Sequence, residues 1–374
     1  MIFRTEVVCY LYIAVCVCML VFNCLLILYR RYENRSLQKY INQISALVDS
    51  QLECLSYSDE MHQEIQQRLG KRLRRIHFLR AFHSVITEKR EEEPALVERY
   101  LLKSRPMFSD LVASYRKEED IKQAYFAFVM ADFSVCRWVH EDPIIDFMME
   151  LIVDKSAYCR ENALKALYRF GDADNVLLAL RLIDENNVFH HEKLITDGLL
   201  SFAGDRQELA ALLWKHFHEF HLELQIPFLN YIRAVSSDFR EPFYEMLANE
   251  RTDKELKIAL IRYFWRHPYP PVAEVLAGFL EREDSRDWEI AAIAATAIRA
   301  YPGEQTILVL RKALLSANWY VRYNAADSLK SLDADFNMLA SVFNGQDRYA
   351  REMLLFHEQQ HEIKEQAQKE AELV

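Results

Sequence analysis

Two groups of histidines carry residue types that could perform metal chemistry. His357, Glu358 and His361 follow the pattern H-E-x-x-H, which on a helix places two imidazoles on one face for zinc beside a glutamate base. A catalytic zinc needs a third protein ligand, and only the short stretch from Glu362 to Val374 follows His361. That stretch continues a polar helical pattern. The motif therefore predicts a surface face of the last helix, and a membrane-tethered zinc hydrolase is the alternative.

The segment 214–221 is the second histidine-rich stretch. His218 and His221 are three positions apart, so on a helix they share a face and could hold a metal ion. Trp214, Phe217 and Phe220 interleave with them and favour packing in a core, with the histidines facing outward or toward neighbouring helices. The sequence has no Ser-His-Asp spacing, phosphate loop or G-x-G-x-x-G motif. We therefore expect no catalytic residue, no metal and no cofactor.

The elements that position these residues are predicted to be helices. The 374 residues include only 7 glycines and 9 prolines, well below the usual share of roughly 12% for the pair. Hydrophobic residues make up 51% of the chain and charged residues 27%, which is typical of a folded protein. The seven cysteines form no CxxC pair, as expected in a reducing compartment. The composition predicts an all-α fold.

Residues 1–29 are predicted to be a membrane anchor. Residues 7–29 contain no charged side chain, and a helix of this length spans about 34 Å, enough to cross a hydrocarbon core of about 30 Å. Tyr10, Tyr12 and Tyr29 lie near the ends, where interfacial aromatic residues occur. A cleaved signal peptide would have a shorter apolar region and a small-residue cleavage site. Residues 1–29 therefore predict an uncleaved transmembrane helix.

Basic residues near this segment predict its orientation. Arg4 on the N-terminal side is balanced by Glu6. The C-terminal side carries four basic residues, Arg30, Arg31, Arg35 and Lys39. The larger basic cluster stays in the cytoplasm. We expect a single-pass protein of the cell membrane with its N-terminus outside and the rest of the chain cytoplasmic.

Residues 30–90 are predicted to form juxtamembrane helices that cap a larger array. An apolar stripe runs from Leu37 to Leu55, and a second runs from Met61 to Leu79. Between them, Ser58 has the residue type and position of a helix N-cap. A coiled coil between copies of the chain is the alternative, but the stripes contain few clean heptads.

A dense basic run follows in this region. Its members are Lys71, Arg72, Arg74 and Arg75. Such juxtamembrane clusters attract anionic lipid at about 1 kcal/mol per residue near the surface, so we expect either lipid contacts or a solvated helix face. The net charge of the whole chain is −10. The acidic remainder disfavours nucleic-acid binding and favours a basic partner or solubility.

A repeated segment predicts the organisation of the rest. Residues 156–167 (SAYCRENALKAL) recur as residues 318–329 (NWYVRYNAADSL), and related segments begin near residues 120, 191, 223, 253, 288 and 347. The clearer copies recur at steps of roughly 29–34 residues, and a helical unit repeated at such a period predicts a stacked solenoid. We expect seven or eight helical pairs over residues 95–360, with a polar helical tail over 361–374.

The repeated segments resemble HEAT repeats in the short-period form found in bacteria. Armadillo-like or mixed α-solenoid assignments stay open, because the periods are shorter than the 40–47 residues of longer HEAT units. The resemblance implies a ladder of hydrogen bonds and ion pairs between neighbouring pairs. By resemblance, the arginines of that ladder are Arg160, Arg322 and Arg351, with Asp287 and Asp347 as loop partners.

The resemblance and the anchor together predict a binding protein. Solenoids hold other molecules on their extended surfaces. We expect a membrane-anchored cytoplasmic scaffold or adaptor that binds a protein partner in a membrane complex, such as an accessory subunit of an envelope or polysaccharide-synthesis assembly. The client, the binding face and the oligomeric state stay open.

Overall fold

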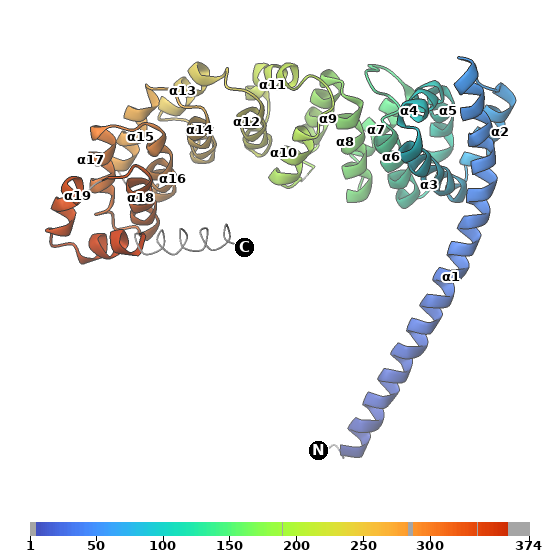
Figure 1. Cartoon of the computed structure of the whole chain (residues 1–374), viewed down its shortest axis with the longest axis horizontal. Coiled ribbons are helices and arrows are strands. Elements are labelled where there is room, and N and C mark those ends of the chain that lie inside the picture. Colours follow the sequence, from blue (N-terminus) through green and yellow to red (C-terminus); the bar gives the residue numbers. More distant parts are fainter. Residues whose placement is uncertain (1–4, 189, 283–286, 335, 358–374) are drawn as a thin grey trace, which may run out of the picture. The chain divides into compact units, whose positions relative to one another are not determined.

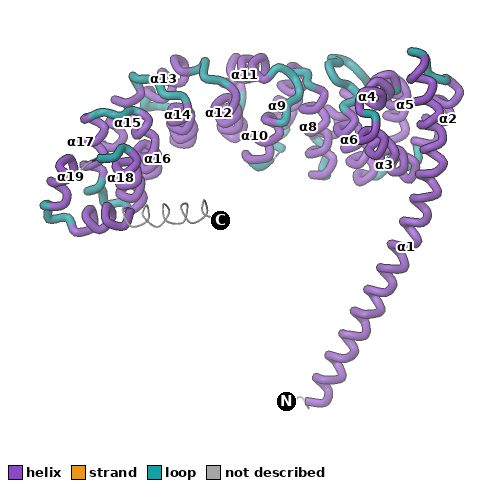
Figure 2. Tube along the Cα trace, in the orientation of Figure 1, coloured by secondary structure: helices purple, strands orange, loops and turns teal. Residues whose placement is uncertain are grey.

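The computed structural model describes residues 5–188, 190–282, 287–334 and 336–357, without the side chains at 5–9, 11, 28–30, 32–34, 336 and 337. All regular structure in these residues is helical (Figure 2), which confirms the predicted all-α fold class. The chain divides into two compact units, Met1–Asn186 and Asn187–Val374, here unit 1 and unit 2. This boundary lies inside the range 95–360 that the repeats predict as one array.

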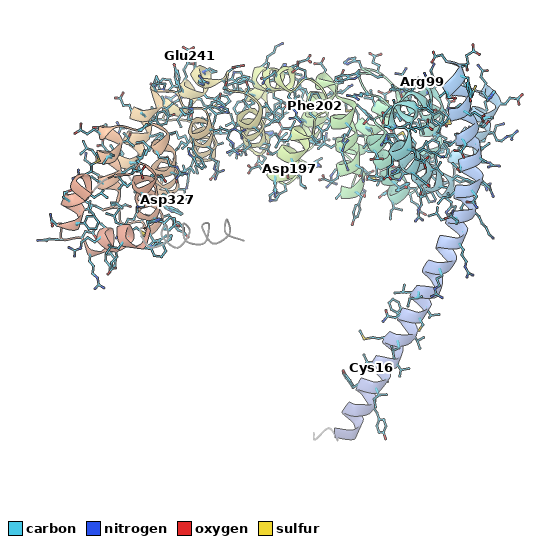
Figure 3. The ribbon with its side chains drawn as sticks, in the orientation of Figure 1. Cys16, Arg99, Asp197, Phe202, Glu241 and Asp327 are labelled. Carbon is cyan, nitrogen blue, oxygen red and sulfur yellow. The ribbon has the colours of Figure 1, made fainter. Side chains whose placement is uncertain are left out.

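Unit 1 begins with the long helix α1 (Thr5–Tyr57). Ile44, Val48 and Leu55 of the predicted apolar stripe are buried where α1 packs on its neighbours. The described side chains from residue 12 to residue 27 are exposed, except that Cys16 is half-exposed (Figure 3). Among the described residues, no helix combines the length and the apolar character needed to cross a membrane.

The next two helices fold back along α1. α2 (Gln63–Leu73) begins after His62, whose backbone N–H donates to Gln51 Oε1 at 3.0 Å. At the start of α3 (Ile76–Glu92), the Phe78 ring lies 4.8 Å from that of Tyr40. The chain therefore reverses direction after α1. The prediction that Ser58 caps the next helix is wrong, because its hydroxyl donates to the Cys54 carbonyl of α1 at 3.1 Å instead.

The rest of unit 1 is made of shorter helices. They are α4 (Pro94–Lys103), α5 (Arg105–Tyr115), α6 (Asp120–Phe133), α7 (Pro143–Ile152), α8 (Ala157–Phe170) and α9 (Ala173–Glu185). α6 packs on α3 and α8, while α7 packs on α5, α8 and α9. A cluster of aromatic rings fills the centre, with Phe82 5.9 Å from Phe108 and 5.8 Å from Phe133.

Unit 2 repeats one helical pair along its length. Its helices are α10 (Glu192–Leu200), α11 (Arg206–Lys215), η1 (Phe217–Glu219), α12 (Leu222–Val235), α13 (Arg240–Ala248), α14 (Lys254–Arg266), α15 (Val272–Glu281), α16 (Trp288–Ala297), η2 (Ile298–Ala300), α17 (Glu304–Ala313), α18 (Trp319–Ser331) and α19 (Phe336–Phe343), followed by a helix whose described part is 348–357. Helices α10, α12, α14, α16 and α18 pack side by side, and we call them the even row (Figure 1). Helices α13, α15, α17 and α19 form a second row.

In unit 2, the repeated segments that begin near residues 191, 223, 253, 288 and 318 coincide with the helices of the even row, and several of them begin with a capping residue. Asp253 accepts a hydrogen bond from the Glu255 N–H at 2.8 Å at the start of α14. Asn318 accepts one from the Tyr320 N–H at 2.8 Å at the start of α18. Each side chain satisfies a backbone donor that the first turn leaves unpaired. The repeats therefore begin where the sequence predicts.

Small residues and short polar side chains set the register inside the even row. Asn324 Nδ2 donates to the Ala292 carbonyl at 2.7 Å, and Ser328 Oγ donates to the Ala295 carbonyl at 2.7 Å. Both bonds connect equivalent turns of α16 and α18. The two helices therefore run parallel, with their C-terminal ends on the same side.

Candidate functional site

Three arginines occupy the positions that the HEAT resemblance assigns to a ladder between pairs: Arg160, Arg322 and Arg351. One guanidinium donates to the Asp154 carbonyl at 2.8 Å, the second to the Ser316 carbonyl and the third to the Gly345 carbonyl at 2.8 Å. Each acceptor lies in the loop before the helix that carries the arginine. These hydrogen bonds differ from the expected ladder because they satisfy free carbonyls within one pair.

Contacts between neighbouring pairs come largely from other side chains. Lys254 Nζ lies 2.6 Å from Glu289 Oε2, which joins the starts of α14 and α16. Asp287, expected as a loop partner, has a weaker electrostatic effect on Lys254 than Glu289 does. Arg322 does reach the following pair, with its guanidinium 5.4 Å from the centre of the Tyr349 ring. Asp347 caps the last described helix by accepting from the Tyr349 N–H at 2.9 Å.

The described part of the H-E-x-x-H motif is built into the end of unit 2. His357 is 7% exposed, and its ring lies 4.4 Å from that of Tyr323 on α18. Its Nδ1 lies 3.8 Å from Asp327 Oδ1, and Asp327 is labelled in Figure 3. Glu358 and His361 lie outside the described residues. The packing of His357 against α18 gives this imidazole a structural position.

The other histidine-rich stretch also serves packing. Phe217 and Phe220 are buried, as the sequence predicts. His218 lies in η1 and His221 precedes α12, so the two histidines are not on one helix. His218 and His221 are exposed, whereas His216 of the same segment is half-buried.

A different group has the geometry of metal ligands. Ligand atoms of His140, Asp172 and Asp174 lie within 4.8 Å of one another. His140 Nδ1 lies 3.1 Å from Asp172 Oδ2, and this hydrogen bond raises the pKa of His140. Asp172 also accepts from the Asn175 N–H at 2.8 Å as the cap of α9. The Asp172 carboxylate therefore already has hydrogen-bond partners within the protein at both of its oxygens.

The most distinctive surface lies at the C-terminal ends of α12 and α14. Arg262 and Arg266 are exposed on α14, and Arg233 is half-buried on α12. His267 Nε2 lies 2.8 Å from the Arg233 carbonyl, which holds the two helix ends together. Among the described residues, none of the three arginines forms an ion pair. Burial lowers the pKa of the Arg233 guanidinium, and the charges of Arg262 and Arg266 lower it further.

One acidic residue borders this cluster without neutralising it. Glu192 on α10 favours the charged form of Arg233, but its Oε1 accepts from Asn230 Nδ2 at 2.7 Å. The cluster therefore keeps an excess of positive charge on a chain whose net charge is −10.

An aromatic side chain extends the surface to the next helix. Trp265 is 42% exposed at the end of α14, and the Arg299 guanidinium lies 5.0 Å from its ring centre. Arg299 Nη1 also lies 3.0 Å from Asp327 Oδ2. We call the surface made by Arg233, Arg262, Trp265, Arg266 and Arg299 the arginine face.

The arginine face is absent from the sequence-based expectations, yet the sequence contains a signal for it. Arg233, Arg266 and Arg299 are evenly spaced along the chain, at a step that lies within the range of the repeat period. Residues at the same position in successive repeats lie side by side in a solenoid. The C-terminal end of a helix attracts cations through the helix dipole. This effect explains why a single arginine lies at the end of each helix, but it does not explain why Arg233, Arg262 and Arg266 lie together.

The residues expected near the membrane lie on α1, at the end of α2 and in the turn after α2. Arg31, Arg35 and Lys39 are exposed on α1, and the side chain of Arg30 lies outside the description. In the basic run, Lys71, Arg74 and Arg75 are exposed, whereas the Arg72 guanidinium lies 5.7 Å from the ring centre of Phe78.

No protein-family model and no curated protein matches this chain.

Proposed function

We propose that this chain is a membrane-anchored helical-repeat scaffold that binds an acidic segment of a protein partner on the arginine face of unit 2. The observation that carries the proposal is the convergence of Arg233, Arg262 and Arg266 without an ion pair among the described residues. Arg262 and Arg266 are four positions apart on α14, and like charges at this spacing on a helix repel each other. Carboxylates of a partner would relieve the repulsion and could form paired hydrogen bonds with each guanidinium.

The local charge favours an acidic partner, whereas the net charge of the chain suggests a basic one. Association responds to the electrostatic potential of the surface that makes contact. The positive charge of the arginine face therefore decides the partner's charge, rather than the net charge of the whole chain. A nucleic acid would bring its phosphates close to the acidic remainder of the chain, which disfavours that partner. Trp265 adds an exposed aromatic group of the kind enriched at protein interfaces.

Residues 7–29 are the proposed anchor. This segment has no charged side chain, and its described side chains between residues 12 and 27 form an exposed apolar helix surface. An apolar surface of this kind is normally covered by lipid or protein. Arg31, Arg35 and Lys39 then favour a cytoplasmic position for both units. The partner we propose belongs to the same membrane, for example an envelope or polysaccharide-synthesis complex of which this chain is an accessory subunit.

Affinity for an acidic probe tests the proposal. The full-length protein in mild detergent is titrated with a fluorescent glutamate-rich peptide. The double variant R262A/R266A should bind about thirtyfold more weakly, because two exposed ion pairs contribute up to about 1 kcal/mol each. The wild-type affinity should also fall as salt is added.

A matched control separates the arginine face from a general charge effect. Arg206 and Arg240 are exposed at the starts of α11 and α13, outside the even row. The variant R206A/R240A removes the same charge and should keep the wild-type affinity. Equal losses in both double variants would contradict the assignment of the arginine face.

A further inference from the structure

A pocket between α2 and α5 holds polar groups that the helices themselves do not use. Its volume is about 350 Å³, near the lower end of the range for small-molecule sites. Met107 and Leu111 of α5 are buried and contribute its apolar lining. Gly70 of α2 keeps the helices close, since a Cβ there would lie 3.1 Å from Met107 Cγ.

An amide inside this pocket lacks hydrogen-bond partners. Gln66 Nε2 and Oε1 are both buried, and neither has a partner among the described residues. Burying an unsatisfied amide costs about 1–3 kcal/mol. Such a group is expected where a ligand supplies both an acceptor and a donor.

Charged side chains stand on both walls. Lys71 in the last turn of α2 and Arg74 directly after this helix line the pocket, and Asp110 lines it from α5. All three are exposed, and none forms an ion pair with a described residue. Two cations that face one carboxylate across a small pocket fit a ligand with a strong negative group and a weaker positive group.

We propose that the α2–α5 pocket binds a phosphate ester that carries an amino group. Lys71 and Arg74 would hold the phosphate, because paired cations suit its charge and geometry. Asp110 and Gln66 Oε1 would accept from the ammonium, and Gln66 Nε2 would donate to an ester or phosphate oxygen. The ligand is either a phospholipid headgroup or a soluble phosphate ester of the same chemistry.

The position of the pocket makes a lipid source geometrically accessible. The first turn of α3, directly after the end of α2, lies against Tyr40. Tyr40 is about 16 Å along α1 from Tyr29 at the helical rise of 1.5 Å per residue. The cationic end of α2 therefore lies on the side of unit 1 toward the anchor. The lipid source rests on the proposed anchor, whereas the pocket chemistry does not.

Calorimetric titration of the full-length protein with O-phosphoethanolamine, in detergent free of phospholipid, tests the proposal. We expect saturable binding that weakens about tenfold or more in K71A/R74A. The variant R68A removes a charge from an exposed position of α2 outside the pocket lining and should bind like the wild type. D110N should weaken binding of O-phosphoethanolamine but not of inorganic phosphate. Q66L should weaken binding while the unliganded protein becomes more stable to heat.

The two sources are separated by the bilayer. After reconstitution in phosphatidylethanolamine bilayers, a lipid-filled pocket no longer takes up the soluble probe, whereas a pocket for soluble esters binds it as it does in detergent. Either result supports the proposal. Absence of saturable binding in detergent, or equal binding by the wild type and K71A/R74A, overturns it. Failure of the glutamate-rich peptide to bind unit 2 would leave this result unaffected.

Discussion

The hydroxyl of Tyr263 is the most direct place to test how the pairs of unit 2 are held together. The ring is fully buried on α14, and its oxygen accepts a hydrogen bond from the Phe239 N–H at 3.2 Å. Tyr231, which lies one repeat earlier on α12, donates to the Arg206 carbonyl at 3.0 Å. In both cases the second helix of a pair is tied to the start of the first.

Replacing Tyr263 by phenylalanine removes this bond and keeps the ring. The lost hydrogen bond contributes about 0.5–1.5 kcal/mol, and the half-buried Phe239 N–H is left without its acceptor. We therefore expect a loss of about 1–2 kcal/mol in the free energy of unfolding. For a unit of this size that corresponds to a fall of roughly 3–6 °C in Tm.

Tyr168 of α8 provides the matched control. Its ring is also buried, but its hydroxyl has no hydrogen-bond partner among the described residues. Tyr168→Phe should leave the thermal midpoint unchanged or raise it, because it removes an unsatisfied polar group. Differential scanning calorimetry of the full-length protein measures both variants. An unchanged midpoint in Tyr263→Phe, or an equal loss in Tyr168→Phe, would refute the reasoning.

Three further predictions concern titration and metal content. Burial raises the pKa of Tyr263 to about 12, so its contribution to stability is complete below its ordinary pKa of about 10 and is lost as the pH rises toward 12; the part of the tyrosinate absorbance that Tyr263→Phe removes should therefore appear together with unfolding, and its appearance near pH 10 in the folded protein would count against the burial of Tyr263. Asp172→Asn should lower the pKa of His140 toward its ordinary value, as followed by NMR, because the hydrogen bond to Asp172 raises it; an unchanged pKa would mean that the pair does not form. The purified full-length protein should hold no stoichiometric zinc, because His357 is packed against Tyr323; one zinc per chain by atomic absorption would contradict this.

The helices could be predicted from the sequence because their signals are local. Asp253 and Asn318 cap α14 and α18 at the start of the recurring segments, and the stripe that includes Ile44 and Val48 is buried as its spacing indicates. The role of Ser58 could not be predicted, because α1 continues to Tyr57 and the Ser58 hydroxyl donates to the Cys54 carbonyl in the last turn of α1. A capping residue acts only where the preceding helix ends.

The candidate sites depend on which side chains meet across helices, and single-residue patterns do not contain that information. Arg160 has the expected residue type, but its donors reach carbonyls of its own pair. Arg233 and Arg266 are one repeat apart in the sequence, and their convergence follows only once α12 and α14 lie side by side. The partnerless amide of Gln66 likewise depends on how α5 packs against α2.

Site-specific photo-crosslinking in living cells tests the central claim most directly. A photoreactive phenylalanine analogue is placed at Trp265 on the arginine face, or at Leu308 on α17 of the second row, two apolar positions that are 42% and 40% exposed. The proposed function predicts a discrete protein adduct from position 265 that R262A/R266A abolishes, and no adduct from position 308. An adduct from position 308 alone, or none from position 265, would contradict binding on the arginine face.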